Sequence, residues 1–257
     1  MPVERRWPVI LLPGAILPAR FAYQALLDEL GDDVDARAKD LEMYAGDVVP
    51  PPGYSLDTEV NGVLRVADEA GFGTFHLVGY SGGGASALAF VSRHPERLRS
   101  LALMEPAWAG TWDQTPREAA VFERFRAIAK LPRDEILPAF IRNHLAPGVE
   151  PPAPPPGPPP PWLPTRQRSI DAFLAAFDAF EFDLDRLRRF DRPVYFALGG
   201  RGDPDLYPRI AARLAGVFRD FTLDRFDDRH HFDPPHRIEP ARVATALRGL
   251  WTRAESG

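Results

Sequence analysis

Short apolar runs alternate along the chain with longer segments in which apolar residues recur every three or four positions. The short runs predict buried strands, and the periodic segments predict helices with one buried face. Strands are predicted at residues 8–12, 36–44, 75–78, 98–104, 193–198 and 221–226. Helices are predicted at residues 21–30, 56–67, 84–91, 210–217 and 243–251. This order predicts an α/β fold, with a mostly parallel sheet covered by helices on both faces.

The alternation stops between residues 108 and 190, where three amphipathic helices are predicted instead, near 121–129, 136–141 and 170–180. Residues 151–164 contain ten prolines and should run as extended polyproline II. We therefore predict a core domain of residues 1–107 and 191–257, with a helical cap inserted at 108–190. The proline-rich segment 151–164 is expected to be a stiff strap within that cap.

A proline-rich segment followed by Arg166 and Arg168 could instead dock on a partner's aromatic groove. The strap is the favoured interpretation because packed helices are predicted on both sides of the segment.

Composition narrows the classes of partner and chemistry. The 257 residues suit one large α/β domain with an insertion, and a net charge of −5 does not favour nucleic acid or an anionic membrane. The chain has no cysteine, which excludes disulfides and thiolate metal sites. No run of about 18 apolar residues and no leader-like N-terminus is visible, so a cytoplasmic location is the default expectation. No cofactor is expected.

The segment Gly79-Tyr80-Ser81-Gly82-Gly83 has the form G-x-S-x-G and lies between a predicted strand and a predicted helix. Glycines around Ser81 permit a tight, strained turn that would present the hydroxyl to a substrate. A serine hydroxyl needs a base to take its proton and a carboxylate to orient that base.

Serine, aspartate and histidine follow in that order, each after a predicted strand. The segments that carry them are 79–83, Gly200-Arg201-Gly202-Asp203-Pro204 and His231-Phe232. In these motifs the chain resembles the α/β-hydrolase fold superfamily from residue 8 to the last helix, with 108–190 where such enzymes often insert a helical cap. The resemblance implies that Ser81 is the nucleophile and His231 the base.

Other readings of the histidines are open. His230 and His236 are weaker candidates for the base, and the group Asp227, Asp228, His230, His231, Asp233 and His236 could be a metal cluster. Its spacing fits no familiar ligand motif, so no metal site is predicted. His76, His94 and His144 are interpreted as structural or exposed.

Two carboxylates compete as the acid. Asp203 holds the superfamily's usual position and ranks slightly ahead, although Asp-Pro is also an ordinary helix start. Glu105 ends the strand at 98–104, where some members, such as haloalkane dehalogenases, carry their acid. A carboxylate that closes a buried strand needs a partner, so one of the two could orient His231 while the other tunes it.

The oxyanion hole is expected to combine the backbone N–H groups of Gly82 and Ala15. Pro13 stands where many members have histidine, which weakens any mechanism that needs a histidine side chain there. A serine at position 81 also argues against dehalogenase or epoxide hydrolase activity, because those enzymes use a nucleophilic aspartate.

These features predict a serine hydrolase that cleaves a small, largely apolar ester or related acyl substrate through an acyl-enzyme. Substrate contacts are expected from Tyr80, Trp108, Trp112 and Trp162, with Phe122, Phe125, Phe173 and Phe177 as further apolar candidates, each of which could equally be cap core. The same triad serves carbon-carbon bond hydrolases, lyases and acyl transferases. A non-catalytic ligand-binding protein of this fold is the alternative from another class.

Overall fold

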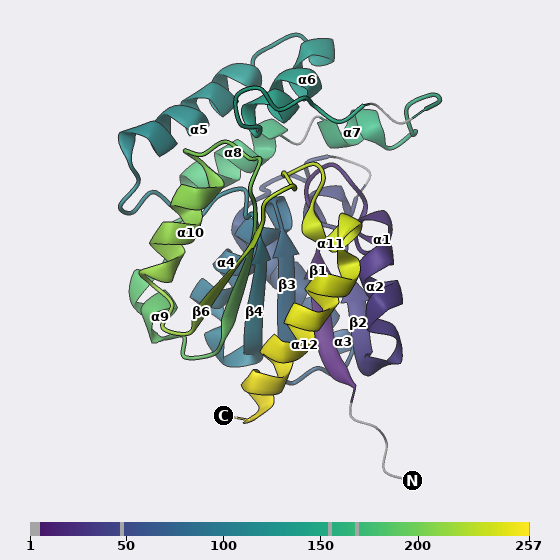
Figure 1. The fold of residues 1–257 in the computed structure, drawn as a ribbon, viewed down its shortest axis with the longest axis vertical. Coiled ribbons are helices and arrows are strands. Elements are labelled where there is room, and N and C mark those ends of the chain that lie inside the picture. Colours follow the sequence, from purple (N-terminus) through teal and green to yellow (C-terminus); the bar gives the residue numbers. More distant parts are fainter. Residues whose placement is uncertain (1–5, 47–48, 154–155, 168–169, 257) are drawn as a thin grey trace.

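The structure is a computed structural model that describes residues 6–46, 49–153, 156–167 and 170–256. Its strands form one parallel sheet in the order β2-β1-β3-β4-β5-β6. They are β1 (Trp7–Leu12), β2 (Val34–Ala38), β3 (Phe75–Tyr80), β4 (Leu98–Met104), β5 (Val194–Gly199) and β6 (Phe221–Phe226). Because the strands are parallel, their carboxyl ends meet at one edge of the sheet, the upper edge in Figure 1.

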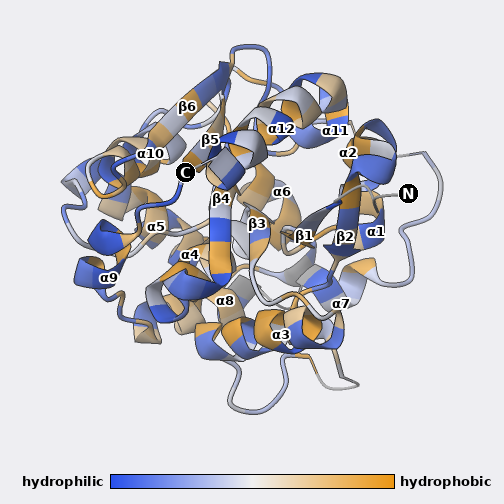
Figure 2. Cartoon of the chain, turned by 90° about the horizontal axis from the view of Figure 1, so that it is seen from below, coloured by the Kyte–Doolittle hydropathy of each residue, from blue (hydrophilic) through white to orange (hydrophobic). Residues whose placement is uncertain are grey.

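Helices cover both faces of this sheet, as the apolar patterns predict. They are α1 (Ala19–Ala22), α2 (Gln24–Leu30), α3 (Leu56–Glu69), α4 (Gly82–Arg93), α10 (Tyr207–Ala215), α11 (Pro235–Ile238) and α12 (Pro240–Ser256). Figure 2 shows α2, α11 and α12 on one side and α3 and α4 on the other. Within the described ranges, no helix is long and apolar enough to cross a lipid bilayer.

Alternate residues of each strand enter two separate apolar cores. In β1, Ile10 and Leu12 pack in the core beneath α3 and α4, whereas Val9 and Leu11 pack in the core beneath α2 and α12. This follows from the two-residue period of a strand, which sends successive side chains to opposite faces. The fold class is therefore the predicted one.

The predicted strand at residues 36–44 is wrong in its second half. β2 ends at Ala38, and residues Glu42–Tyr44 form a 3-10 turn. The buried Glu59 carboxylate accepts hydrogen bonds from the backbone N–H groups of Glu42 (2.9 Å) and Met43 (3.1 Å). These bonds hold the segment away from the edge of the sheet.

The segment between β4 and β5 contains helices, and several lie over the carboxyl edge of the sheet (Figure 1). They are α5 (Pro116–Ile128), α6 (Arg133–Asn143), α7 (Leu163–Gln167), α8 (Ile170–Ala179) and α9 (Leu184–Arg189). The predicted strap at 151–164 is too long, because α7 already begins at Leu163. Pro154, Pro155 and Arg168 lie outside the described residues. The division into a core domain and a cap at 108–190 stays a prediction.

His236, in α11, is fully buried. Its ring centroid lies 5.2 Å from that of Tyr23 and 4.8 Å from that of Tyr80. Among the described residues, neither of its ring nitrogens has a hydrogen-bond partner. Burial lowers the pKa of His236 to about 3, because the apolar surroundings disfavour the charged ring.

We expect His236→Phe to stabilise the protein, because phenylalanine keeps the ring packing and removes the unpaired N–H. The gain should be about 1 kcal/mol at pH 7. An unfolded histidine takes up a proton below about pH 6.5, whereas the folded ring does so only near pH 3, so wild-type stability is lost as pH falls below 6.5. The gain should therefore grow by roughly 2 kcal/mol at pH 5. Urea unfolding at both pH values measures this gain. If the wild-type protein and His236→Phe lost the same free energy of unfolding between pH 7 and pH 5, this account would be contradicted.

Candidate functional site

Ser81 lies at the sharp turn between β3 and α4, with a φ of 53°. A residue other than glycine rarely adopts a positive φ, so the surrounding backbone has to hold Ser81 in this conformation. The backbone can pack closely enough around the turn because its neighbours are glycines. A Cβ at Gly79 would lie 2.5 Å from the carbonyl oxygen of Gly83, and one at Gly83 would lie 2.3 Å from that of Leu12. The glycines therefore let the turn fit against β1 and raise Ser81 toward the carboxyl edge.

Glu105 follows the last residue of β4 and also has a positive φ, of 46°. Its side chain is buried. One carboxyl oxygen, Oε1, accepts a hydrogen bond from the backbone N–H of Gly199 at the end of β5 (2.8 Å). The other oxygen, Oε2, lies 3.0 Å from Nδ1 of His231. Both oxygens of this buried carboxyl group are therefore partnered.

His231 lies in the loop after β6 and joins the other two residues. Its Nε2 is 2.9 Å from Oγ of Ser81, and the hydroxyl of Tyr207 lies 3.2 Å from the same nitrogen. The hydroxyl of Tyr80 donates a hydrogen bond to the backbone oxygen of His231. Ser81, His231 and Glu105 thus form one continuous hydrogen-bonded chain.

Burial decides the electrostatics of this chain. It lowers the pKa of His231 to about 3, so the ring is neutral near pH 7 and Nε2 can accept a proton. Burial also raises the pKa of Glu105 to about 8, and the N–H of Gly199 opposes that increase by stabilising the carboxylate. An ionised Glu105 would accept a hydrogen bond from Nδ1–H of His231 and leave the Nε2 lone pair directed at Ser81.

Asp203, which ranks slightly ahead as the acid on sequence alone, is not a partner of His231 in this structure. Its Oδ2 lies 2.8 Å from Nη2 of Arg124 in α5, and its Oδ1 accepts the N–H of Asp205 (2.8 Å). Asp203 therefore caps its own turn and pairs with α5. The contacts favour Glu105 as the carboxylate that orients the histidine.

The two predicted oxyanion-hole residues, Gly82 and Ala15, both line the cavity in front of Ser81. Gly82 is the first residue of α4, where the N–H groups have no partner within the helix. The loop at Ala15 is held by Tyr44, whose hydroxyl donates to the Ala15 carbonyl oxygen (2.7 Å). The backbone oxygen of Pro13 in turn accepts the N–H of Gly83 (3.0 Å), which ties this loop to α4.

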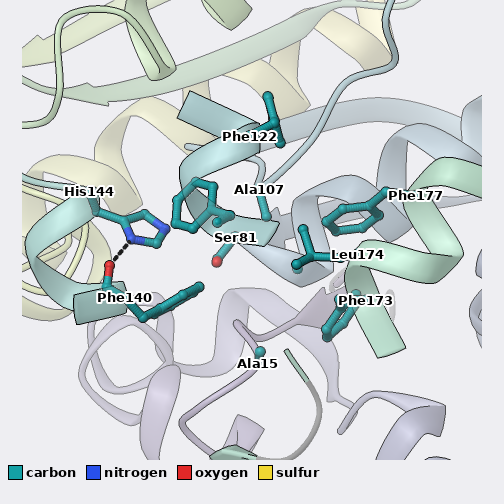
Figure 3. Close-up of a pocket in the computed structure, with 11 residues that line it drawn as sticks. Ala15, Ser81, Ala107, Phe122, Phe140, His144, Phe173, Leu174 and Phe177 are labelled. Carbon is teal, nitrogen blue, oxygen red and sulfur yellow. Dashed lines mark hydrogen bonds between the residues drawn. The ribbon is translucent and has the colours of Figure 1, made fainter. Parts of the chain in front are cut away.

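The cavity has a volume of about 40 Å³ and is almost entirely apolar (Figure 3). Besides Ser81, Gly82 and Ala15, the residues that line it are Ala107, Phe122, Phe125, Phe140, His144, Phe173, Leu174 and Phe177. Most of them come from α5, α6 and α8, above the carboxyl edge of the sheet. The space therefore suits an apolar group placed against the serine hydroxyl.

A family model described as the alpha/beta hydrolase fold matches residues 42–145, and solved structures with this overall arrangement cover nearly the whole chain. The chain therefore has the α/β-hydrolase fold. A membrane phospholipase A aligns with a TM-score of 0.72 at 20% identity, over 99% of this chain and 81% of its own. A meta-cleavage product hydrolase from Pseudomonas fluorescens IP01 aligns with a TM-score of 0.66 at 19% identity, over 96% of this chain and 91% of its own.

The similarity in sequence to curated proteins is more local. An uncharacterized carboxylesterase, nap, from Bacillus subtilis (strain 168) is 29% identical over 108 residues, which are 39% of this chain and 33% of that protein. The chain thus spans no more than about a third of the length of the curated relatives that it matches.

Among the predicted substrate contacts of this α/β-hydrolase-fold chain, the phenylalanines line the cavity and the tryptophans do not. Trp108 stacks on Phe177 with ring centroids 5.2 Å apart, behind the cavity wall. Trp112 packs against Phe182, and Trp162 lies half-buried just before α7. Tyr80 lies beneath Ser81 and packs against His231 rather than lining the cavity.

Four lining residues were not predicted to contact substrate, namely Ala107, Phe140, Leu174 and His144. His144 was interpreted as structural or exposed, but it is buried and lines the cavity. It follows α6, and its position depends on how that helix packs over the sheet. No local motif marks such a contact.

The possible metal cluster is not assembled. His230 Nδ1 accepts hydrogen bonds from the backbone N–H groups of Phe232 (3.2 Å) and Asp233 (3.1 Å). His231 Nδ1 faces Glu105, and the ring of His236 packs on that of Tyr80. In the part of the chain that the structure describes, no group of three or more ligating side chains could hold a metal ion.

Proposed function

We propose that this protein is a serine hydrolase that cleaves a small, largely apolar ester or related acyl substrate through an acyl-enzyme. The observation that carries this proposal is the hydrogen-bonded chain from Ser81 through His231 to Glu105, which opens on an apolar cavity. The names carboxylesterase and phospholipase among the similar proteins support an ester as the substrate.

In the first half of the reaction, Oγ of Ser81 attacks the substrate carbonyl carbon while Nε2 of His231 takes the hydroxyl proton. The negative charge that forms on the carbonyl oxygen is stabilised by the N–H groups of Gly82 and Ala15. His231 then gives its proton to the departing alkoxide as the carbon–oxygen bond breaks, and an acyl-Ser81 ester remains.

In the second half, a water molecule gives a proton to Nε2 of His231 and attacks the acyl carbon. Collapse of the second tetrahedral intermediate returns the proton to Oγ of Ser81 and releases a carboxylic acid. Glu105 keeps the ring of His231 in one orientation throughout and stabilises the imidazolium that forms twice.

The size and lining of the cavity support a small, apolar substrate. Its walls come from phenylalanine, leucine and alanine side chains, which favour an apolar acyl group. The small volume of the cavity favours a short acyl group.

We expect a fluorophosphonate probe to label the protein on Ser81 and Ser81→Ala to abolish labelling, because the variant has no nucleophile. Turnover of short nitrophenyl esters should fall at least about 10⁴-fold. The variant's circular dichroism spectrum and melting temperature provide the folding control. A folded wild-type protein that the probe leaves unlabelled would contradict the proposal. Labelling without ester turnover would instead indicate a carbon-carbon hydrolase, lyase or transferase.

The choice of acid is tested by Glu105→Gln and Asp203→Asn, two substitutions that each exchange a carboxylate for an amide. We expect Glu105→Gln to lower kcat/KM by about 10³- to 10⁴-fold, because the amide cannot enforce the productive tautomer of His231. Asp203→Asn should change kcat/KM by less than about threefold, since a partly exposed ion pair contributes little. The reverse order of effects would identify Asp203 as the acid.

The rate of probe labelling should increase with pH. The reactive form needs an ionised Glu105, and its ionised fraction grows as pH rises through its raised pKa of about 8. His231, with its lowered pKa, is already neutral across this range. We therefore expect the labelling rate to rise between about pH 6 and pH 9 and the rise to be absent in Glu105→Gln. A wild-type rate that is constant above pH 6 would exclude this control by Glu105.

A further inference from the structure

His144 is an exception to the apolar lining of the cavity. Of the described side chains that line it, only those of Ser81 and His144 are polar. His144 is almost fully buried, at 2% exposed, and Figure 3 shows its ring directed toward the space in front of Ser81. A buried polar group at such a place costs stability unless it finds a partner.

One side of the ring is already satisfied. Nδ1 lies 2.7 Å from the backbone oxygen of Phe140, one turn earlier in α6. A carbonyl oxygen only accepts hydrogen bonds, so Nδ1 carries the proton. Burial lowers the pKa of His144 well below its usual value, and the neighbouring His231 adds to this effect, so the ring is neutral. Nε2 is then a bare acceptor.

Within the part of the chain that the structure describes, the hydrogen bond of the ring is the one made by Nδ1, and Nε2 is left facing the cavity. Aromatic rings hold the imidazole in place, with centroids 4.4 Å away for Phe140, 4.7 Å for Phe125 and 5.2 Å for Phe232. The ring also stacks on that of His231, with centroids 4.6 Å apart and planes 12° from parallel. A rigid, unpaired acceptor therefore lies beside the proposed base.

We propose that Nε2 of His144 accepts a hydrogen bond from a hydroxyl group of the substrate, placed within a few bonds of the carbonyl that Ser81 attacks. The inference rests on the proposed function and narrows its substrate class from plain alkyl esters to hydroxylated ones. A hydroxyl group suits the site better than an amide group. An amide would bring a carbonyl oxygen that also needs a hydrogen-bond donor, and the described side chains that line the cavity offer none besides Ser81. His144 then determines specificity without taking part in proton transfer.

The test compares substrates that differ only by hydroxyl against methyl. On the acyl side, these are the nitrophenyl esters of 3-hydroxybutyrate and 3-methylbutyrate, and of lactate and isobutyrate. On the alcohol side, they are 2-hydroxyethyl and propyl butyrate, followed by acid release. We expect the wild-type protein to prefer the hydroxylated member of at least one pair by about tenfold in kcat/KM, since a substrate without the hydroxyl would cover the acceptor and leave it unpaired.

Three variants isolate the acceptor. His144→Phe keeps an aromatic ring against His231 but has no acceptor, so the preference should disappear. His144→Gln offers an amide oxygen and should restore part of it. Phe140→Leu changes the packing of the cavity wall but not its polarity, so the preference for hydroxylated substrates should remain.

Labelling by a fluorophosphonate that has no hydroxyl separates this inference from the proposed function. Labelling of the wild-type protein needs the hydrogen-bonded chain to Ser81 but not the acceptor on His144. A labelled wild-type protein that shows no hydroxyl preference in any pair, or the same preference in His144→Phe, overturns the inference alone. A wild-type protein that is not labelled overturns both.

Discussion

The pairing of β3 with β4 is the constraint on which the site depends. Tyr80 pairs with Met104 at the ends of these neighbouring strands, so the next residues, Ser81 and Glu105, emerge side by side. Both have a positive φ, and the turn is fixed by backbone bonds from Ser81 N to Met104 O (3.1 Å) and from Ala107 N to Ser81 O (2.8 Å). Strain at these two residues is maintained by the surrounding sheet rather than by the turn itself.

Burial gives this pair its chemical character. A carboxyl group beneath the nucleophile would be unfavourable if it were alone, but Gly199 and His231 supply one partner for each oxygen. Since Gly199 ends β5 and His231 follows β6, four strand ends contribute to one polar chain. The apolar rings above leave little room for water, so the few polar contacts in the cavity act in an environment of lower dielectric constant, where they are stronger.

The elements of the core could be predicted because each carries its own periodicity, and Ser81 because the glycines of its turn form a local motif. The acid could not be chosen from the sequence. Glu105 and Asp203 both follow buried strands, and which one faces His231 depends on side-chain direction at positive φ and on the position of Arg124 in α5. His144 was missed for a related reason, because its place in the cavity is set by the packing of α6. Residues 36–44 look like a strand, yet a buried Glu59 redirects their backbone.

The small volume of the cavity has a consequence for how substrate reaches Ser81. About 40 Å³ holds no more than about three water molecules, and the cavity is only partly open to solvent, so an ester larger than this space needs the helices above to move outward. Arg124 with Asp203 (2.8 Å) and Arg166 with Asp40 (3.1 Å) join those helices to the loops below, and each pair has one partner open to solvent. Dissolved salt weakens such pairs but scarcely affects a fully buried chain. Ionic strength should therefore act on admission to the site, while the bond-breaking steps proceed unchanged.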